Sequence, residues 1–338
     1  LLKTWVMTGF VIALHTNYQV VAQIFDLPFA SFTLTNPSIS VTQGRQSART
    51  IFGYTQPTSI FQEPSYLAAF LGPCLILLIV FVLEQRSHEL LFKRAWQNWL
   101  ALLAMAVAVF LSNSQAILVG LVMTLLFLFG RGLVRRARIL KLLLSTIGVA
   151  LLVNQLLQLI GVGFLQASFY RYQYLLFNIL DRSTAQVTSF ADRYQGTQIG
   201  LAIWRQYPIL GVGLGNMGYY NPLERTGTNN AWVQLLVEQG IFGFAALLAV
   251  FGTLAWQLSW LLRQTGQRTF WRAALVAMLC ILVLTVVDGL FTFNWVDPLR
   301  VFVLAMAHLV YVQAAGQQVD NRSALSFEPR QLLKGKTV

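Results

Sequence analysis

Long apolar runs recur along the chain and are separated by shorter polar stretches. Each run approaches the length of about 20 residues that an α-helix needs to cross the hydrocarbon core of a membrane. The runs lie at about residues 5–25, 65–84, 96–112, 114–130, 139–161, 233–262, 270–292 and 298–315. This pattern predicts an all-α fold, a polytopic transmembrane helical bundle of about eight spans, with residues 1–338 forming a single membrane domain.

Two polar segments are too long to be simple connections between spans. They are a first external loop, 26–64, and a large external loop, 162–232. Within the second, "FADRYQGTQIGLAIWRQYP" has apolar positions at helical spacing and predicts a helix at about 190–207. We expect either an amphipathic helix on the outer membrane boundary, with Trp204 and Tyr207 at headgroup level, or a helix packed on the bundle.

The composition agrees with a membrane protein. Hydrophobic residues make up 56% of the chain and charged residues 11%, whereas soluble domains contain about 25% charged residues. Cys74 and Cys280 lie within apolar runs, which predicts small buried hydrophobes and neither a disulfide framework nor a zinc site. The chain starts at Leu1, in or just before an apolar run, so we expect a fragment that lacks its natural N-terminus.

The net charge of +12 raises the question of nucleic-acid binding, and the positions of the charges answer it. Of the 24 basic residues, 16 occupy one alternating set of segments: Lys3, Arg86, Lys93, Arg94, Arg131, Arg135, Arg136, Arg138, Lys141, Arg263, Arg268, Arg272, Arg322, Arg330, Lys334 and Lys336. The positive-inside rule places this set, with a tail at 316–338, in the cytoplasm. These charges are topology signals, and nucleic acid is excluded as a partner.

The other eight basic residues are all arginines in the segments predicted to lie outside: Arg45, Arg49, Arg171, Arg182, Arg193, Arg205, Arg225 and Arg300. A guanidinium group offers a rigid bidentate fork to phosphate, whereas a lysine is a point charge. The external face is therefore suited to a phosphate-bearing partner.

The stretch "GLGNMG" at 213–218 spells the glycine fingerprint of a dinucleotide-binding turn. That fingerprint requires a preceding strand and an acidic residue about 20 positions later. Here a predicted helix and Pro208 come first, so the stretch is predicted to be a tight turn beside the bundle. Such a turn either returns the chain to the membrane or also presents the N–H groups of Gly213 and Gly215 to an anion.

Four motifs follow in order between about residues 45 and 262: "FQEPSYLAAFL", "LSNSQAIL", "YPILGVGLGNMGYY" and "TNNAWVQLLVEQGIFGFAALLAVF". Together they resemble the C-terminal region of the O-antigen ligase and Wzy-type polymerase family. In that family a large periplasmic loop carries an Arg-bearing helix and a "P-x-x-G-x-G-x-x-N/F" turn, then enters a span at "HN…L…E-x-G-x-x-G". The first motif is similar to the family's "EPN/S-x-x-A", and the second lies where the family commonly has "SRG" or "SRA".

The resemblance implies a glycosyltransferase of the membrane-embedded GT-C type in the bacterial inner (cytoplasmic) membrane, with its active face extracytoplasmic. Such an enzyme moves a glycan from undecaprenyl pyrophosphate onto an acceptor sugar and uses no metal, nucleotide or other cofactor. Its implied partners are the lipid-linked glycan, membrane lipid, a chain-length regulator and a flippase.

The resemblance also implies that external arginines hold the pyrophosphate of the donor. Its departure builds negative charge, which a bidentate arginine stabilises in the transition state. Arg193 matches the family's loop arginine. The further candidates for the pyrophosphate and glycan are Arg49, Arg45, Arg205, Gln115, Gly213 and Gly215.

The chain departs from the family pattern at two positions. Asn229 or Asn230 stands where the family has the His that serves as base on the acceptor hydroxyl, and Gln115 stands where it has the Arg of "SRG". An Asn accepts no proton at neutral pH, although it can orient a hydroxyl. Three interpretations remain: Glu63 is the base, the pyrophosphate leaves with little base assistance, or the activity has been lost.

Two further carboxylates have a weaker claim. Glu238 is expected about two turns into its span, and Asp288 lies in the seventh apolar run without a motif around it. An ionisable residue inside a membrane is by default a functional candidate. His15 and His308 lie in apolar runs and match no family position.

The leading hypothesis is a Wzy-like polymerase of a surface or exopolysaccharide pathway, because the chain lacks the ligase-type His and the "SRG" Arg. The alternatives are an O-antigen ligase to a lipid or protein acceptor, a transporter or flippase of lipid-linked sugars, and an inactive scaffold homologue. A transporter predicts ionisable residues that face each other near the middle of the membrane. Here the polar residues gather in the outside loops instead.

Overall fold

The computed structural model describes residues 1–30, 50–51, 54–61, 63–133, 137–140, 144, 148, 151–152, 155, 158, 189–220, 228, 230–266, 269–292 and 298–327. Within them the elements are α1 (Leu2–Ile24), β1 (Thr50–Ile51), β2 (Tyr54–Thr55), α3 (Pro64–Leu83), α4 (Ser87–Leu90), α5 (Ala95–Leu111), α6 (Gln115–Gly130), α9 (Ser189–Gln206), α10 (Met217–Tyr220), α11 (Ala231–Gln264), α12 (Phe270–Asp288) and α13 (Pro298–Phe327). The two strands pair antiparallel as a short hairpin. The predicted all-α helical membrane bundle is confirmed.

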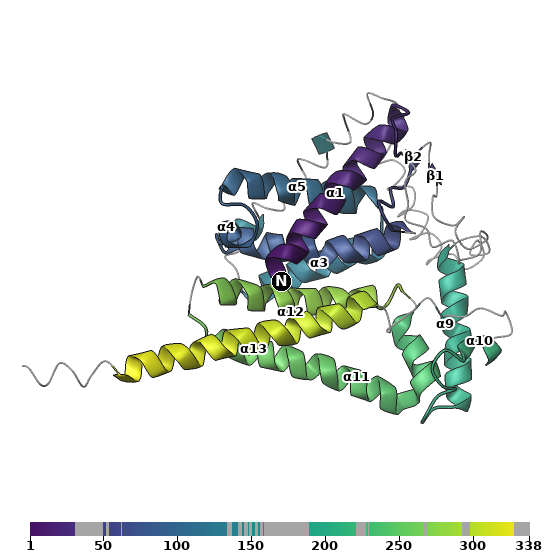
Figure 1. The fold of residues 1–338 in the computed structure, drawn as a ribbon. Helices are drawn as coiled ribbons and strands as arrows, with labels where there is room; N and C mark the ends of the chain where they lie inside the picture. The colour runs from purple at the N-terminus through teal and green to yellow at the C-terminus, as the bar shows by residue number, and fades with distance from the viewer. Residues whose placement is uncertain are drawn as a thin grey trace, which may run out of the picture.

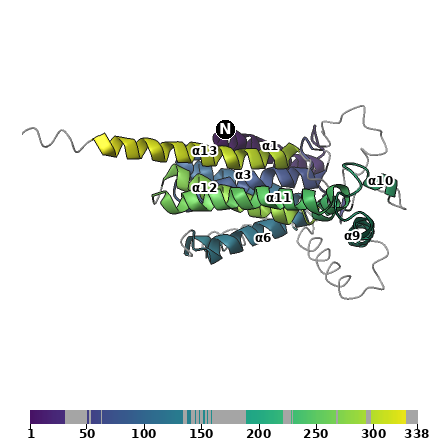
Figure 2. The same cartoon turned by 90° about the horizontal axis from the view of Figure 1, so that it is seen from below.

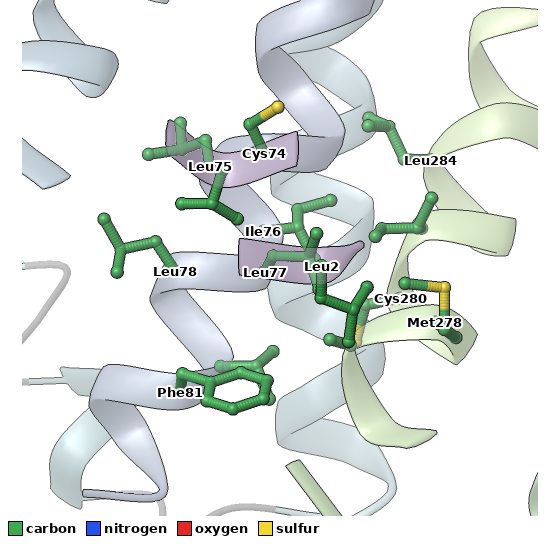
Figure 3. Close-up of a cluster of buried hydrophobic side chains, with 14 of the residues drawn as sticks. Leu2, Cys74, Leu75, Ile76, Leu77, Leu78, Phe81, Met278, Cys280 and Leu284 are labelled. Atoms are coloured by element: carbon green, nitrogen blue, oxygen red, sulfur yellow. The ribbon is translucent and has the colours of Figure 1, made fainter. Parts of the chain in front are cut away.

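The core of the bundle lies around α3 and α12. Leucine, isoleucine and phenylalanine side chains of both helices pack together with Cys74 and Cys280, which are fully buried as predicted (Figure 3). Small residues permit this close packing, since a Cβ at Gly72 would lie 3.0 Å from Leu284 and one at Gly120 would lie 2.4 Å from it. Between helices in a membrane no hydrophobic driving force acts, and small residues allow the close contact on which packing depends.

The predicted spans are partly confirmed. Among the described residues, four helices are long and apolar enough to cross a membrane: Pro64–Leu83, Ala231–Gln264, Phe270–Asp288 and Pro298–Val319. Ala95–Leu111 and Ala116–Gly130 are shorter apolar helices at two more predicted positions. Helix α1 covers the predicted run 5–25 but is more polar, because its outer half carries His15, Asn17 and Gln19. Most of the predicted span 139–161 lies outside the described residues.

Helices α9 and α10 lie at one end of the bundle in both overall views, with α9 crosswise to α12 (Figures 1 and 2). The hairpin β1–β2 is at the same end (Figure 1). The positive-inside rule predicts that this end, called the external end below, faces away from the cytoplasm. At the opposite end α13 continues to Phe327, so the segment predicted as a tail from residue 316 begins as a continuation of that helix.

Candidate functional site

Helix α11 is broken near its beginning. Gly240 has φ 63° and ψ −165°, a backbone conformation outside the helical region, so 231–239 and 241–264 are two helical segments. The first segment lies beside α9, and the second runs back along α12 and α13 (Figure 1). Glu238 lies seven residues after the start of this candidate span, about two turns in, as the sequence predicts, and its position directly precedes the break. Glu238 lies before the break, is 6% exposed and accepts a hydrogen bond from Gln234 Nε2 at 3.0 Å.

The segment 208–215, here called the glycine turn, forms backbone hydrogen bonds with the residues around this break in α11. Val212 N donates to Val237 O at 2.8 Å, Gly213 N donates to Glu238 O at 2.8 Å, and Ile241 N donates to Pro208 O at 2.9 Å. A Cβ at Gly211 would lie 2.5 Å from the carbonyl carbon of Glu238, and one at Gly240 would lie 2.1 Å from Ile209 O. Only glycine permits this approach and the positive φ at both positions.

This geometry explains the fingerprint-like glycines. Helix α9, not a strand, precedes the turn, as the sequence predicts. The N–H of Gly213 is engaged by Glu238 O, so the role that the structure displays for Gly213 is docking of the turn. Gly215 also has a positive φ, and a Cβ there would meet no atom within 4 Å. Anion binding at these two glycines stays a prediction.

Helix α9 packs on the first segment of α11. Ile203 of α9, Met217 of α10, and Val233 and Val237 of α11 form a small apolar cluster, with Ile199 and Trp204 packed against it. Ile199 and Ile203 of the predicted apolar face of α9 thus pack against protein, whereas Ala202 and Tyr207 of the same face are exposed. For these two isoleucines, the structure shows packing on the bundle, which is one of the two environments expected for this helix.

A second face of α9 lies against the segment before α11. A Cβ at Gly196 would lie 3.0 Å from Thr228 O, and one at Gly200 would lie 2.6 Å from Thr228 Cγ2. Position 193 is three residues before Gly196 and seven before Gly200. At helical spacing these three positions share a face. The backbone of Arg193 is therefore on the side of α9 that lies against Thr228.

Asn230 caps the first segment of α11. Its Oδ1 accepts hydrogen bonds from Trp232 N at 3.1 Å and Val233 N at 3.2 Å, the arrangement typical of an N-cap. Thr228 Oγ1 donates to Asn230 O at 2.6 Å. The adjacent Ala231 N donates to Gly289 O at 2.9 Å and so ties this segment to the end of α12. The cap orients the Asn230 side chain toward its own helix. Asn229 lies outside the described residues.

A buried ion pair stands next to this contact, and sequence reasoning missed it. Arg300 Nη2 lies 2.8 Å from Asp288 Oδ2, and the two residues are 5% and 7% exposed. Arg300 also donates to Thr292 Oγ1. A buried charge requires a partner. Asp288, near the end of the apolar run 270–292, was therefore the sequence signal for a buried ion pair. The pairing itself depends on the fold, because α12 and α13 pack together.

Glu63 belongs to a second cluster at the external end. It is the N-cap residue of α3, and its Oε2 accepts a hydrogen bond from Ser65 Oγ at 3.0 Å. The preceding segment is attached to α1. Gln19 Oε1 accepts hydrogen bonds from Thr58 N at 3.0 Å and Ser59 N at 2.8 Å, and His15 Nδ1 lies 2.8 Å from Ser59 Oγ. The path of the chain into Glu63 is therefore fixed by α1.

The remaining candidate residues are less well defined. Arg205 is exposed in the last turn of α9. Gln115 is the first residue of α6, and its side chain is not described. Arg45 and Arg49 lie outside the described residues. The structure thus brings position 193, Thr228, Asn230, the glycine turn and Glu238 into one external cluster, here called the α9–α11 site.

The comparison with protein families covers this site. Residues 100–248 match the family model described as O-antigen ligase. The match includes α6, α9, the glycine turn and the broken start of α11. The class is therefore a multi-pass helical membrane protein with a region of the O-antigen ligase type.

The region 100–248 thus resembles O-antigen ligases, in agreement with the motifs of the sequence. No curated protein sequence matches the chain.

Proposed function

We propose that the protein is a polymerase that moves an undecaprenyl-pyrophosphate-linked oligosaccharide onto an acceptor glycan in O-antigen or exopolysaccharide assembly. It acts without a metal, on the extracytoplasmic side of the bacterial inner membrane. The observation that carries this proposal is the α9–α11 site within the matched region, where the arginine-bearing helix packs against the segment that leads into α11.

Arg193 is the proposed pyrophosphate ligand. The shared face of positions 193, 196 and 200 directs this part of α9 toward the segment around Thr228 and Asn230. The family pattern has its base at this segment. A donor phosphate near position 193 would therefore be close to the region where the acceptor hydroxyl is activated. A bidentate guanidinium there would stabilise the departing pyrophosphate. Arg205, Arg45 and Arg49 are proposed as supporting cations.

Glu63 is the proposed base. The Oδ1 of Asn230 accepts hydrogen bonds from its own helix, which favours a carboxylate elsewhere for proton removal. Glu63 is partly exposed at the external end of α3, so it is open to a substrate.

An O-antigen ligase is the second candidate, because the matching family model carries that description. Polymerase and ligase differ in the acceptor, and the products of a defective enzyme differ accordingly. Loss of a polymerase leaves single repeat units on the final acceptor. Loss of a ligase leaves long glycan attached to the lipid carrier.

The experiment compares Arg193→Ala, Arg193→Lys and Glu63→Gln in the full-length protein, expressed in a deletion strain. Membrane levels are checked first, and surface and carrier-linked glycans are then separated on gels. We expect single-unit glycan with Arg193→Ala, partial recovery with Arg193→Lys, and single-unit glycan with Glu63→Gln. Arg263→Ala, an exposed arginine at the opposite end of the bundle, is the control.

Two outcomes would change the proposal. Accumulation of long carrier-linked glycan would replace the polymerase by the ligase. Wild-type chain lengths with both Arg193→Ala and Glu63→Gln at normal abundance would refute the proposed site and favour a scaffold or transport function.

A further inference from the structure

Four large apolar side chains are exposed where the glycine turn meets the break of α11. Ile209 and Leu210 in the turn are 59% and 74% exposed, and Ile241 and Phe242 after the break are 45% and 64% exposed. We call these four residues the apolar tip. The two pairs are contiguous, since Ile241 N donates to Pro208 O, and the Cα of Gly240 faces Ile209 O and Leu210 N.

The apolar tip is continuous with the surface of a membrane-crossing helix. The segment 241–264 belongs to α11, which is long and apolar enough to span a membrane. Only 28% of the most apolar 18-residue stretch of this helix is buried inside the protein. Leu248, Val250 and Trp256 are exposed farther along it. Ile241 and Phe242 therefore begin the lipid-facing surface at its external end, and Ile209 and Leu210 extend that surface onto the turn.

Residues suited to the headgroup region border the apolar tip. Tyr207 and Tyr220 pack edge to face, with ring centroids 5.4 Å apart, and both are exposed. Arg205 is exposed in the last turn of α9, two residues before Tyr207. Tyrosines are enriched at membrane–water interfaces, and a basic side chain binds lipid phosphates.

We propose that the apolar tip inserts among the acyl chains of the outer leaflet and holds the α9–α11 site at the membrane surface. The anchor is then the turn rather than the apolar face of α9, because Ile199 and Ile203 pack on α11. The insertion itself does not depend on the enzymatic proposal. If Arg193 binds a carrier pyrophosphate, the anchor explains how α9 is kept at the height of lipid headgroups.

The test measures lipid contact at single positions of the full-length protein. Leu210→Cys is labelled with an environment-sensitive fluorophore, while Cys74 and Cys280 are buried and protected from the reagent. The protein is reconstituted in vesicles of phosphatidylethanolamine and phosphatidylglycerol. Quenching by lipids brominated on their acyl chains is compared with quenching by aqueous iodide.

Two control positions calibrate the result. Trp256→Cys, on the exposed face of α11, gives the signal of lipid contact, and Gln198→Cys, exposed on α9, gives the signal of water. We expect Leu210→Cys to be quenched by brominated lipid, as at position 256, and protected from iodide. Iodide quenching as at position 198 would overturn the proposal. Protection from both quenchers would also overturn it, because another protein surface would then cover the apolar tip.

Discussion

Removing Arg300 is expected to destabilise the external end of the bundle strongly, because it leaves Asp288 buried without its arginine. Both residues are at least 93% buried, with a nitrogen–oxygen distance of 2.8 Å. At an effective dielectric constant of about 20, two unit charges at that distance attract by roughly 6 kcal/mol. Desolvation of both ions offsets much of this gain, yet breaking such a pair from one side typically costs about 3–5 kcal/mol.

The assay is a denaturation titration of the purified full-length protein in detergent, followed by tryptophan fluorescence. Arg300→Met and Asp288→Leu are each expected to lower the free energy of unfolding by about 3–5 kcal/mol. The double variant removes both charges together and is expected to recover most of that loss, since an apolar replacement of a buried pair is often neutral. Arg263→Ala, an exposed arginine at the other end, is expected to change stability little.

The reasoning would be refuted if Arg300→Met lowered stability by less than about 1 kcal/mol, the range of an exposed pair. It would also be refuted if the double variant were as unstable as the sum of the single variants. In that case each residue would stabilise the fold through other contacts, and the pair would not be the stabilising unit.

Three other changes have defined outcomes. Gly240→Ala places a Cβ against Ile209 O at a positive φ and is expected to cost at least about 1–3 kcal/mol, measured by the same titration; Gly252→Ala, where a Cβ meets no atom within 4 Å, is the control. Asn230→Ala removes the cap of α11 and is expected to cost about 1 kcal/mol, whereas Asn230→Asp retains it; equal stability of both variants contradicts the capping role. Gln19→Ala leaves the buried N–H groups of Thr58 and Ser59 without their acceptor and is expected to cost about 1–3 kcal/mol per group. Unchanged hydrogen exchange at residues 58 and 59 in that variant would contradict the contact.

The turn between α5 and α6 shows how much of the structure a local sequence pattern predicts. The sequence break at "LSNS" is short, and the structure has a tight turn there in which Asn113 has φ 49°. An asparagine tolerates that conformation better than most residues. The burial of Ser112 and Asn113, at 1% and 4% exposed, follows instead from neighbouring helices that a local pattern does not include.

The start of α11 shows the opposite case. The run from Ala231 to Gln264 is apolar enough to predict one continuous helix, and Gly240 within it is no strong signal, since glycines are common in membrane helices. At the break, the turn at 208–213 forms backbone hydrogen bonds with α11. Glu238 lies within the candidate span, and the turn covers it at the break.

By itself the sequence determined the class of the protein, because apolar run length, positive-inside charge and the order of four motifs are properties of short segments. It also indicated the helix that carries Arg193 and the turn after Pro208. Only the tertiary structure decided which segments meet: the turn with the break at Gly240, Thr228 with α9, and Arg300 with Asp288. Those contacts join residues far apart in the chain, and their geometry depends on how the helices pack rather than on any local pattern.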